Sequence, residues 1–370
     1  MLAMKNPYSL ALITMVLFVS MSVAFGQVPT EKAAQQFATY DDFKLQSGAV
    51  IHGFRVGYRT LGTLNSEKSN AILFPSWLGG KSEDLLRFAQ PGQWLDASKY
   101  YVVFLDAIGD GITTSPSNSQ AQPLMEFPEF TIRDMVESEL RLATDVLHLT
   151  HVHAVVGISM GGMQAFEWIV AHPDYMDQAV AIESSPQSTS ADMLFWTTQI
   201  HAIELDPAWN HGKPTGPPIS GLALESEIFW NNATSSAQHL RETKTKDFPA
   251  LLATLAKESA HDAGAAADHI RQRQAIMNLD VPAEFGGTIE QAVARVRAKL
   301  LVMVVPEDLV VNPTPAIAFA TKLGAPVILL DSPCGHLTAL GCIAFGAPIV
   351  QFLADPSSVH DATLHEAPNQ

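Results

Sequence analysis

Residues 152–168 read VHAVVGISMGGMQAFEW, an apolar run that passes through a single serine into a helical pattern. The serine, Ser159, has a glycine two positions away on each side, Gly157 and Gly161. A serine at the tip of a sharp strand-to-helix turn brings these flanking positions into close contact, which glycine tolerates because it has no Cβ. The spacing therefore predicts that Ser159 is a nucleophile on such a turn. The alternative is a glycine-rich turn with a bystander serine.

Strand-like and helical segments alternate along the rest of the chain. Short apolar runs occupy 70–80, 100–109, 153–159, 178–185, 300–308 and 326–333, and helical patterns occupy 131–149 and 161–173. Such runs suit strands that are buried on both faces of a parallel sheet. Residues 54–62, FRVGYRTLG, alternate as an edge or antiparallel strand does. The pattern predicts an α/β fold, with a mostly parallel central sheet and helices on both faces.

One long interval has little strand signal. Residues 188–291 contain several helical patterns, and a loop rich in proline and glycine at 212–221 separates the first two. We interpret this interval as a helical cap inserted into a core formed by residues 27–187 and 292–370. A cap of this length is expected to roof a pocket and to exclude water from it.

A serine hydroxyl needs a base to become a good nucleophile, and the base needs a carboxylate to orient it. In enzymes with this turn, the acid and then the histidine follow the serine, each after a later strand. His336, in DSPCGH, follows the last apolar run, and Asp308, in VVPEDLVV, follows the run before it. Glu307 is the alternative acid. Asp331 precedes His336 closely, but its place at the end of a strand predicts that its side chain points away.

The negative oxygen of an acyl-transfer transition state needs backbone N–H donors. The N–H group of Met160, directly after the serine, is the first predicted donor. The second comes from the loop PSWLGG at 75–80, where Trp77 is the first choice and Leu78 the next.

The composition disfavours several classes of partner. The 370-residue chain has 22 lysines and arginines against 38 acidic residues, a formal net charge of −16. Thinly spread cations argue against nucleic acid, because phosphate backbones bind clustered positive charge. The close pair His151 and His153 lacks carboxylates in a ligand pattern, and no phosphate-binding glycine motif occurs. We therefore expect neither a metal nor an organic cofactor.

The first 26 residues have the pattern of an export signal. Lys5 precedes an apolar run over 10–19, and Ala24 and Gly26 supply small residues before a cleavage point. We expect a signal peptide at 1–26, cleaved after Gly26, and a secreted or periplasmic protein with no stable membrane insertion afterwards. An uncleaved membrane anchor is the alternative.

The chain has two cysteines, Cys334 and Cys342, eight positions apart. In an oxidising compartment they can close a short loop. The spacing alone does not separate a disulfide from two buried thiols, because the distance between the Cα atoms decides.

Several segments together resemble the homoserine O-acetyltransferase family of α/β-hydrolase-fold enzymes. The similarity is carried by FPEFTIRDMV at 127–136, by 153–168, and by the segments 59–74, 204–209 and 331–336. It spans most of the chain after the signal segment, and the cap matches least. The resemblance implies the α/β-hydrolase fold, an acyl-Ser159 intermediate with His336 as base and Asp308 orienting it, and a homodimer joined through the cap.

Two positions depart from that family. In members of that family, the residue after the histidine is typically an aspartate, which binds the amine of homoserine. An arginine in the cap binds the carboxylate. The corresponding residues here are Leu337 and Ile200. Because two apolar residues leave the charges of an amino acid unpaired on burial, we expect homoserine specificity to be lost. We assign both residues to the substrate pocket, together with Leu78, Phe195 and Trp196, although packing of the cap also explains its aromatic residues.

The sequence thus predicts an exported serine hydrolase that cleaves an ester or related acyl bond of a small molecule. The first alternative is an acyltransferase that keeps the acyl-serine chemistry and uses a different acceptor. The second is a non-catalytic binding protein on the same fold, which the three filled triad positions disfavour.

Overall fold

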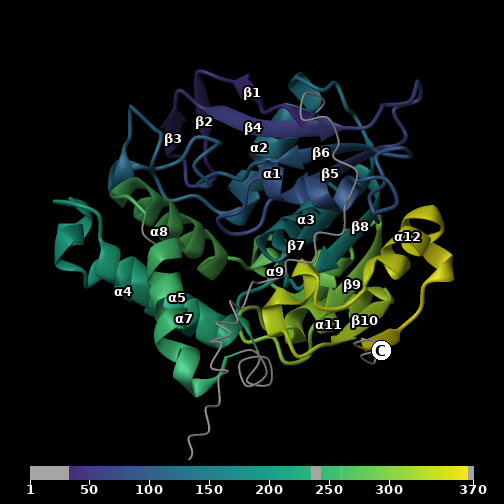
Figure 1. The fold of residues 1–370 in the computed structure, drawn as a ribbon. Helices are drawn as coiled ribbons and strands as arrows, with labels where there is room; N and C mark the ends of the chain where they lie inside the picture. Colours follow the sequence, from purple (N-terminus) through teal and green to yellow (C-terminus); the bar gives the residue numbers. More distant parts are fainter. Residues whose placement is uncertain (1–32, 235–242, 260, 366–370) are drawn as a thin grey trace, which may run out of the picture.

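The computed structural model describes residues 33–234, 243–259 and 261–365, and a nine-stranded sheet lies at its centre (Figure 1). The strand order is β1-β4-β6-β5-β7-β8-β9-β10-β11. The strands are β1 (Gln36–Thr39), β4 (Arg55–Leu61), β5 (Ala71–Pro75), β6 (Tyr101–Leu105), β7 (Val152–Ile158), β8 (Met176–Ile182), β9 (Lys299–Val304), β10 (Val327–Asp331) and β11 (Ala362–His365). A separate hairpin consists of β2 (Asp42–Lys44) and β3 (Val50–His52).

The sheet is mostly parallel. Every pairing among β5 to β11 is parallel, whereas β4 pairs antiparallel with both β1 and β6. The predicted α/β class is therefore confirmed. The antiparallel assignment of residues 54–62 is right, but β4 is not an edge strand, because β1 lies outside it.

Helices cover both faces of the sheet. The helices of the core are α1 (Ser82–Leu85), η2 (Leu86–Ala89), α2 (Ile132–Asp145), α3 (Met160–Ala171), α9 (Val281–Glu284), α10 (Ile289–Val293), α11 (Thr314–Leu323), η6 (Gly335–Leu340) and α12 (Gly346–Ala354). Alternate side chains of one strand enter different apolar clusters. Val102 and Phe104 pack with η2 and α12, whereas Val103 and Leu105 pack with α2, α3 and α11. This alternation fixes a three-layer architecture.

Helix α2 shows how closely local sequence sets an element. The side chain of Thr131 accepts the N–H of Asp134, and the Asp134 carboxylate accepts the N–H of Thr131, which starts the helix. The helix ends at Asp145, before the end of the helical pattern predicted at 131–149. Val146 is accordingly 39% exposed rather than part of the buried face.

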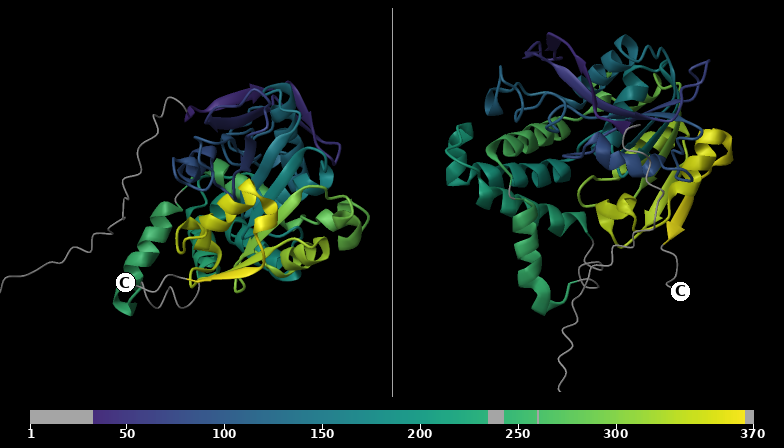
Figure 2. Two further views of the ribbon diagram at one scale, coloured as in Figure 1. Left: turned by 90° about the vertical axis from the view of Figure 1, so that its right-hand side faces the viewer. Right: turned by 45° about the horizontal axis from the view of Figure 1, so that its top comes forward.

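The interval between β8 and β9 contains a group of helices on one side of the sheet (Figure 2). These are α4 (Ser190–Glu204), η4 (Pro207–Gly212), α5 (Ile219–Ala233), α7 (Phe248–Glu258) and α8 (Ala263–Met277). Ile203, Leu222 and Ile270 belong to an apolar cluster of their own. By contrast, α9 and α10 pack against α3 and α11 of the core. The group that we call the cap therefore ends near residue 277, earlier than the predicted boundary at 291.

The predicted signal peptide at 1–26 lies outside the described residues. Within the described ranges, no helix is both long enough and apolar enough to span a bilayer.

Candidate active site

The turn between β7 and α3 has the strained geometry that the glycine spacing predicts. Ser159 has φ 54° and ψ −123°, a region that side chains with a Cβ rarely adopt. A Cβ on Gly157 would lie 2.0 Å from the carbonyl oxygen of Gly161, and a Cβ on Gly161 would lie 2.5 Å from that of Pro75. Both positions therefore require glycine, and the turn holds the Ser159 hydroxyl at the carboxyl end of β7.

Three predicted residues form one hydrogen-bonded series. The Oγ of Ser159 lies 2.8 Å from Nε2 of His336, and Nδ1 of His336 lies 2.6 Å from Oδ2 of Asp308. The other oxygen of Asp308 accepts the N–H groups of Val310 and Val311 at 2.8 and 3.0 Å. A carboxylate held in this way accepts the Nδ1 proton, which leaves Nε2 free to accept the proton of the hydroxyl. This arrangement can activate a serine for attack on a carbonyl carbon.

The rival residues lie elsewhere. Glu307 is exposed next to the buried Asp308. Asp331 is also exposed, and its carboxylate contacts Nδ1 of His365 at 2.7 Å instead of His336. The geometry thus separates Asp308 from both alternative acids.

The loop 75–80 lies against the serine turn. The N–H of Ser76 donates to Leu105 at 3.0 Å, and the carbonyl of Ser76 accepts from the Gln164 side chain at 3.1 Å. Within the described chain, the N–H groups of Met160 and Trp77 donate to no other group of the protein. The two predicted donors are therefore available to bind an oxyanion, and this role stays a prediction.

A cap residue that the sequence did not reveal fixes the same loop. Gln272 on α8 is fully buried, and its side-chain oxygen accepts the N–H of Gly79 at 2.9 Å. Its amide nitrogen donates to the carbonyl of Ile108 at 3.1 Å. The two bonds join the cap to the loops after β5 and β6. Because 193 positions separate Gly79 from Gln272 along the chain, no local pattern points to the contact.

A cavity of about 240 Å³ adjoins the serine. It is lined by Trp77, Leu78, Ile158, Ser159, Glu183, Trp196, Phe229, Val310, His336, Leu337 and Leu340. Three of the predicted pocket residues, Leu78, Trp196 and Leu337, are thus at its wall. That a substrate binds there stays a prediction.

Two predicted pocket residues do not reach this cavity. Phe195 packs behind the wall, with its ring centroid 4.6 Å from that of Trp196 and 6.5 Å from that of Phe229. Ile200 lies one helical turn beyond Trp196 on α4 and packs with Trp209 inside the cap. Phe195 is adjacent to Trp196, so its side chain points about 100° away around the helix axis. Ile200 is four residues further on and lies about 6 Å along that axis.

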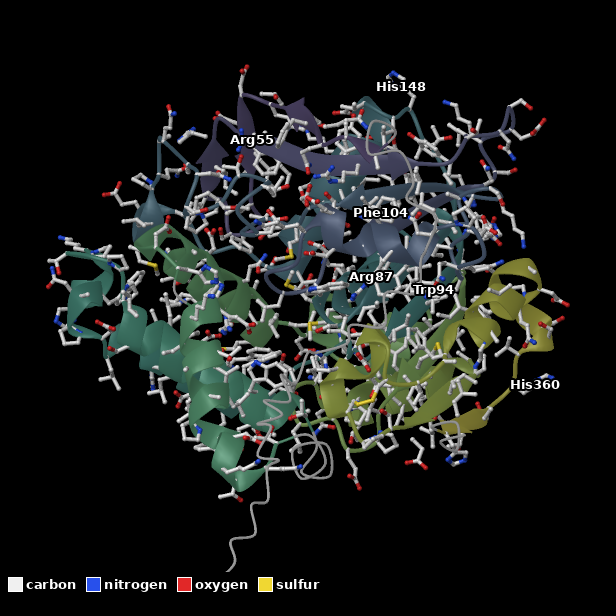
Figure 3. The ribbon with its side chains drawn as sticks, in the orientation of Figure 1. Arg55, Arg87, Trp94, Phe104, His148 and His360 are labelled. Atoms are coloured by element: carbon white, nitrogen blue, oxygen red, sulfur yellow. A yellow bond between two sulfur atoms is a disulfide. The ribbon has the colours of Figure 1, made fainter. Side chains whose placement is uncertain are left out.

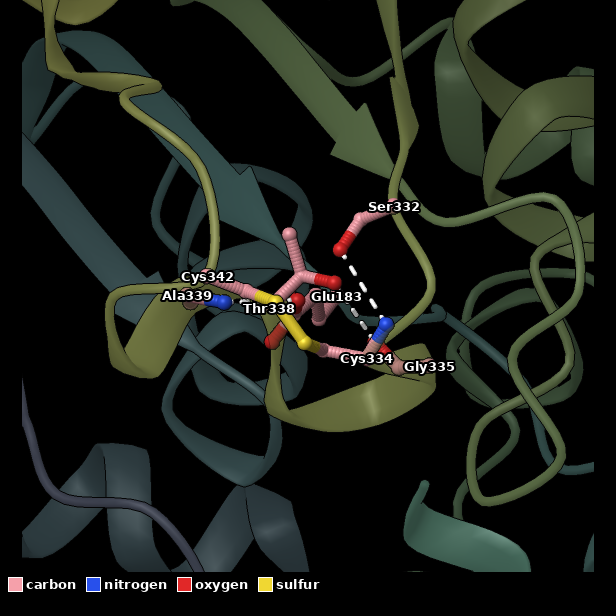
Figure 4. The surroundings of a disulfide bond; sticks show 7 residues. All are labelled: Glu183, Ser332, Cys334, Gly335, Thr338, Ala339 and Cys342. Atoms are coloured by element: carbon pink, nitrogen blue, oxygen red, sulfur yellow. Dashed lines mark hydrogen bonds between the residues drawn. A yellow bond between two sulfur atoms is a disulfide. The ribbon is translucent and has the colours of Figure 1, made fainter. Parts of the chain in front are cut away.

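The segment that carries His336 is fixed at two points (Figure 4). A disulfide joins Cys334 to Cys342, with the Cα atoms 6.3 Å apart, and so closes the loop around η6. Inside the loop, the N–H of Ala339 donates to Oε1 of Glu183 at 2.9 Å. The bond ties the histidine segment to the end of β8.

Glu183 is a buried carboxyl group in the cavity wall, at a position where the sequence predicts only a strand. Burial, and next the negative charge of Asp308, raise the pKa of Glu183 well above its usual range. The N–H groups of Ala339 and Thr338 act in the opposite direction. The Glu183 carboxyl group thus lies beside Asp308 and holds the histidine segment through the N–H of Ala339.

Comparison with known proteins adds the family relationships. The family model described as alpha/beta hydrolase fold matches residues 75–280. A probable esterase of Corynebacterium glutamicum is 30% identical over 319 residues, which cover 81% of this chain and 88% of that protein. A homoserine O-acetyltransferase of Methanococcoides burtonii is 37% identical over 207 residues, which cover 50% of this chain and 42% of that protein.

A solved structure agrees with these relatives. An acetylester hydrolase from Corynebacterium glutamicum superposes with a TM-score of 0.79 at 27% sequence identity. The match covers 88% of this chain and 96% of that chain.

Proposed function

Since this chain belongs to the α/β-hydrolase fold family, among the relatives of homoserine O-acetyltransferase, we propose that it is an exported serine esterase with an acyl-Ser159 intermediate. The similarity to a probable esterase and to an acetylester hydrolase supports the esterase class. The observation that carries the serine mechanism is the hydrogen-bonded series of Ser159, His336 and Asp308 at the cavity wall.

In the proposed reaction, His336 takes the proton of Ser159 as Oγ attacks the ester carbonyl. The N–H groups of Met160 and Trp77 stabilise the negative oxygen that develops. The alcohol leaves with the proton from His336, and an acyl-serine remains. Water, activated by the same imidazole, then releases the acid and restores the serine. Asp308 keeps the imidazole in the tautomer and orientation that both steps need.

The cavity favours a short, uncharged acyl group. Its volume of about 240 Å³ is below the roughly 300–1,000 Å³ of pockets that enclose drug-sized ligands. Leu337 and Trp196 contribute apolar wall close to the serine. An acyl chain of a few carbons matches such a space, because its apolar surface is buried without an unpaired polar group.

The cavity also supports water over an amino acid as the acyl acceptor. Leu337 lies at the wall, next to His336, at the position where related acetyltransferases typically carry an aspartate for the homoserine amine. Ile200, at the place of the cap arginine, is buried away from the cavity. A zwitterionic acceptor would therefore lose water without gaining a charged partner.

Hydrolysis of 4-nitrophenyl acetate by the mature protein and by Ser159→Ala tests the proposal. We expect kcat to fall about 10⁶-fold in the variant, because the nucleophile is removed. Equal nitrophenol release from both proteins would rule out the serine mechanism. The same assay with alcohols or homoserine at millimolar concentration, read by mass spectrometry, identifies the acceptor. Acyl transfer that exceeds hydrolysis would favour the acyltransferase.

Export is the part of the proposal that rests on residues 1–26 alone. N-terminal sequencing of the protein recovered from the medium or periplasm tests it directly. A mature chain that begins at Gln27 supports cleavage after Gly26, and an intact N-terminus in the membrane fraction supports the anchor.

A further inference from the structure

A second hollow lies beside the reaction cavity, across the short helix η6 that carries His336. It is a groove of about 720 Å³ between η2 and the segment 339–350. Leu340 lines both the groove and the reaction cavity, so that the two spaces share a wall. The groove is the larger of the two, and no step of the proposed reaction uses it.

The floor of the groove is aromatic and already packed. The ring of Trp94 lies 5.0 Å from that of Phe88 and 6.0 Å from that of Phe345, measured between centroids. All three side chains are at most 7% exposed, so their positions are fixed by the core beneath. The buried Ile343 and the exposed Val350 extend the apolar lining, and Gln93 adds a polar side chain to it. Such a surface suits a hydrocarbon chain.

Only one ionisable side chain, Arg87, is among the residues that line the groove. Its guanidinium lies 4.7 Å from the ring centroid of Phe88 and 5.8 Å from that of Trp77 (Figure 3 labels Arg87 and Trp94). Within the described residues, the contacts of this guanidinium are the two rings and a through-space attraction from Asp84. Asp84 attracts it through space but uses its carboxylate to accept the N–H of Lys81. In a chain with a net charge of −16, this groove therefore has one exposed cation, Arg87, among the described residues that line it.

The two spaces have complementary sizes for the two halves of an ester. The reaction cavity of about 240 Å³ holds a short acyl group, and the remainder of a longer substrate has to leave it. The two spaces meet at Leu340, which lines both and is 46% exposed, so that a chain can pass over it from one space to the other. Trp77, at the wall of the cavity, has its ring centroid 6.4 Å from that of Phe88 in the groove.

We propose that the groove is a subsite for the alcohol part of the ester, which takes an apolar chain that ends in a carboxylate facing Arg87. The inference rests on the proposed esterase function. The preferred substrate class is then a short-chain acyl ester of an ω-hydroxy carboxylic acid. Ser159 Oγ bonds to the acyl carbon, the ester C–O bond breaks, and the hydroxy acid leaves with the proton from His336. Water then releases the short acid.

Kinetics on two esters of equal chain length test the charge. We expect wild type to prefer 6-acetoxyhexanoate to hexyl acetate, measured as the ratio of the two kcat/KM values. Arg87→Gln should lower this ratio about tenfold, because it removes the cation that pairs with the carboxylate. Arg55→Gln is the matched control, since its guanidinium also lies over an aromatic ring, Phe37, but distant from the groove (Figure 3). An unchanged ratio in Arg87→Gln overturns the proposal.

Filling the groove tests its apolar part. Ala347 is exposed at the start of α12, where a tryptophan would occupy the groove without entering the core. We expect Ala347→Trp to lower kcat/KM for 6-acetoxyhexanoate and hexyl acetate, the two esters of six-carbon alcohols, at least fivefold relative to kcat/KM for ethyl acetate. An equal effect on all three esters would show that the groove holds no part of the substrate.

Calorimetry separates this inference from the proposed function. Binding of 6-acetoxyhexanoate to Ser159→Ala needs no turnover, and we expect Ser159→Ala/Arg87→Gln to bind it about tenfold more weakly. If wild type does not hydrolyse ethyl acetate but the binding difference persists, the esterase function fails and the anionic subsite stands. Equal binding by both proteins overturns the subsite whatever the kinetics show.

Discussion

The core and the cap contribute to the candidate site in different ways. Ser159, Asp308 and His336 follow β7, β9 and β10, at the carboxyl ends of parallel strands, where the topology of an α/β sheet brings loops together. The cap contributes wall and support, through Trp196 at the cavity and Gln272 against the loop after β5. The ends of the strands therefore determine where the predicted reacting groups lie, whereas long-range packing determines the shape of the space around them.

After loss of Ser159 itself, the largest expected effect is also in the core. Asp308→Asn should lower kcat for 4-nitrophenyl acetate about 10⁴-fold, because an amide cannot hold His336 in the required tautomer. Stopped assays on the purified variant, with circular dichroism to verify folding, measure this. Glu307→Gln is the matched control at the exposed neighbouring position and should retain wild-type activity. A larger loss in Glu307→Gln than in Asp308→Asn would assign the acid to the other residue.

Glu183 tests whether the core also needs support for the histidine segment. We expect Glu183→Ala to lower kcat about 10- to 100-fold, because the N–H of Ala339 loses its buried acceptor and His336 shifts. Glu183→Gln keeps an oxygen at the same place and should restore most of the activity. The kcat and KM values of both variants, measured from pH 5 to 9, distinguish the roles. If the glutamine variant is as slow as the alanine variant, the carboxyl group itself takes part in the reaction.

Gln272 links the cap to the loop that contains Trp77, a predicted oxyanion donor. Gln272→Leu removes the bonds to Gly79 and Ile108, so that the loop with the Trp77 N–H loses a constraint. We expect about a tenfold fall in kcat with little change in KM, less than for loss of a whole oxyanion donor. Gln274→Leu on the same helix is the control, because that side chain pairs with Arg271 instead. Equal activity in both variants would show that the cap does not support the predicted oxyanion donor and contributes only to substrate binding.

The strand ends account for what could be predicted. The glycine spacing around Ser159 fixed a turn type, and His336 and Asp308 followed from the order of the apolar runs. Their geometry agrees with a triad, while their catalytic roles stay predictions. The fold class followed from the same runs, because buried parallel strands are continuous in apolar residues.

The rest depended on contacts that have no local signal. Phe195 and Trp196 are adjacent and both aromatic, and only the phase of α4 against the core decides that Trp196 faces the cavity. Glu183 follows an apolar strand directly, so the sequence predicts the end of that strand there and gives no sign of a buried carboxyl group. The cap boundary near 277 depended on α9 and α10 packing against the core, which their short sequences do not reveal.

The smallest expected effect on activity is at Asp268, which links the cap to the core. Replacing Asp268 should instead change the thermal stability, and this change should depend on pH. Asp268 on α8 accepts the N–H of Ser117, and burial raises the pKa of Asp268 to about 7, well above that of a carboxyl group in water. A carboxyl group whose pKa is raised in the folded state contributes stability at acid pH, and this contribution is lost as the pH rises through about 7. Asp268→Asn keeps the acceptor oxygen and cannot ionise. We therefore expect its Tm to exceed that of wild type by a few degrees at pH 8.

The Tm difference between Asp268→Asn and wild type should shrink toward pH 5, where wild-type Asp268 is largely protonated. The activity of the variant at pH 7 should stay within about twofold of wild type. Thermal unfolding followed by circular dichroism across this pH range measures the difference. Glu139→Gln is the counterpart in the core, since burial raises the pKa of Glu139 on α2 to about 8. A Tm difference in Asp268→Asn that is the same at every pH would mean that the cap joint carries no titrating charge. If only Glu139→Gln shows the pH-dependent gain, alkaline loss of stability begins in the core instead of at the cap.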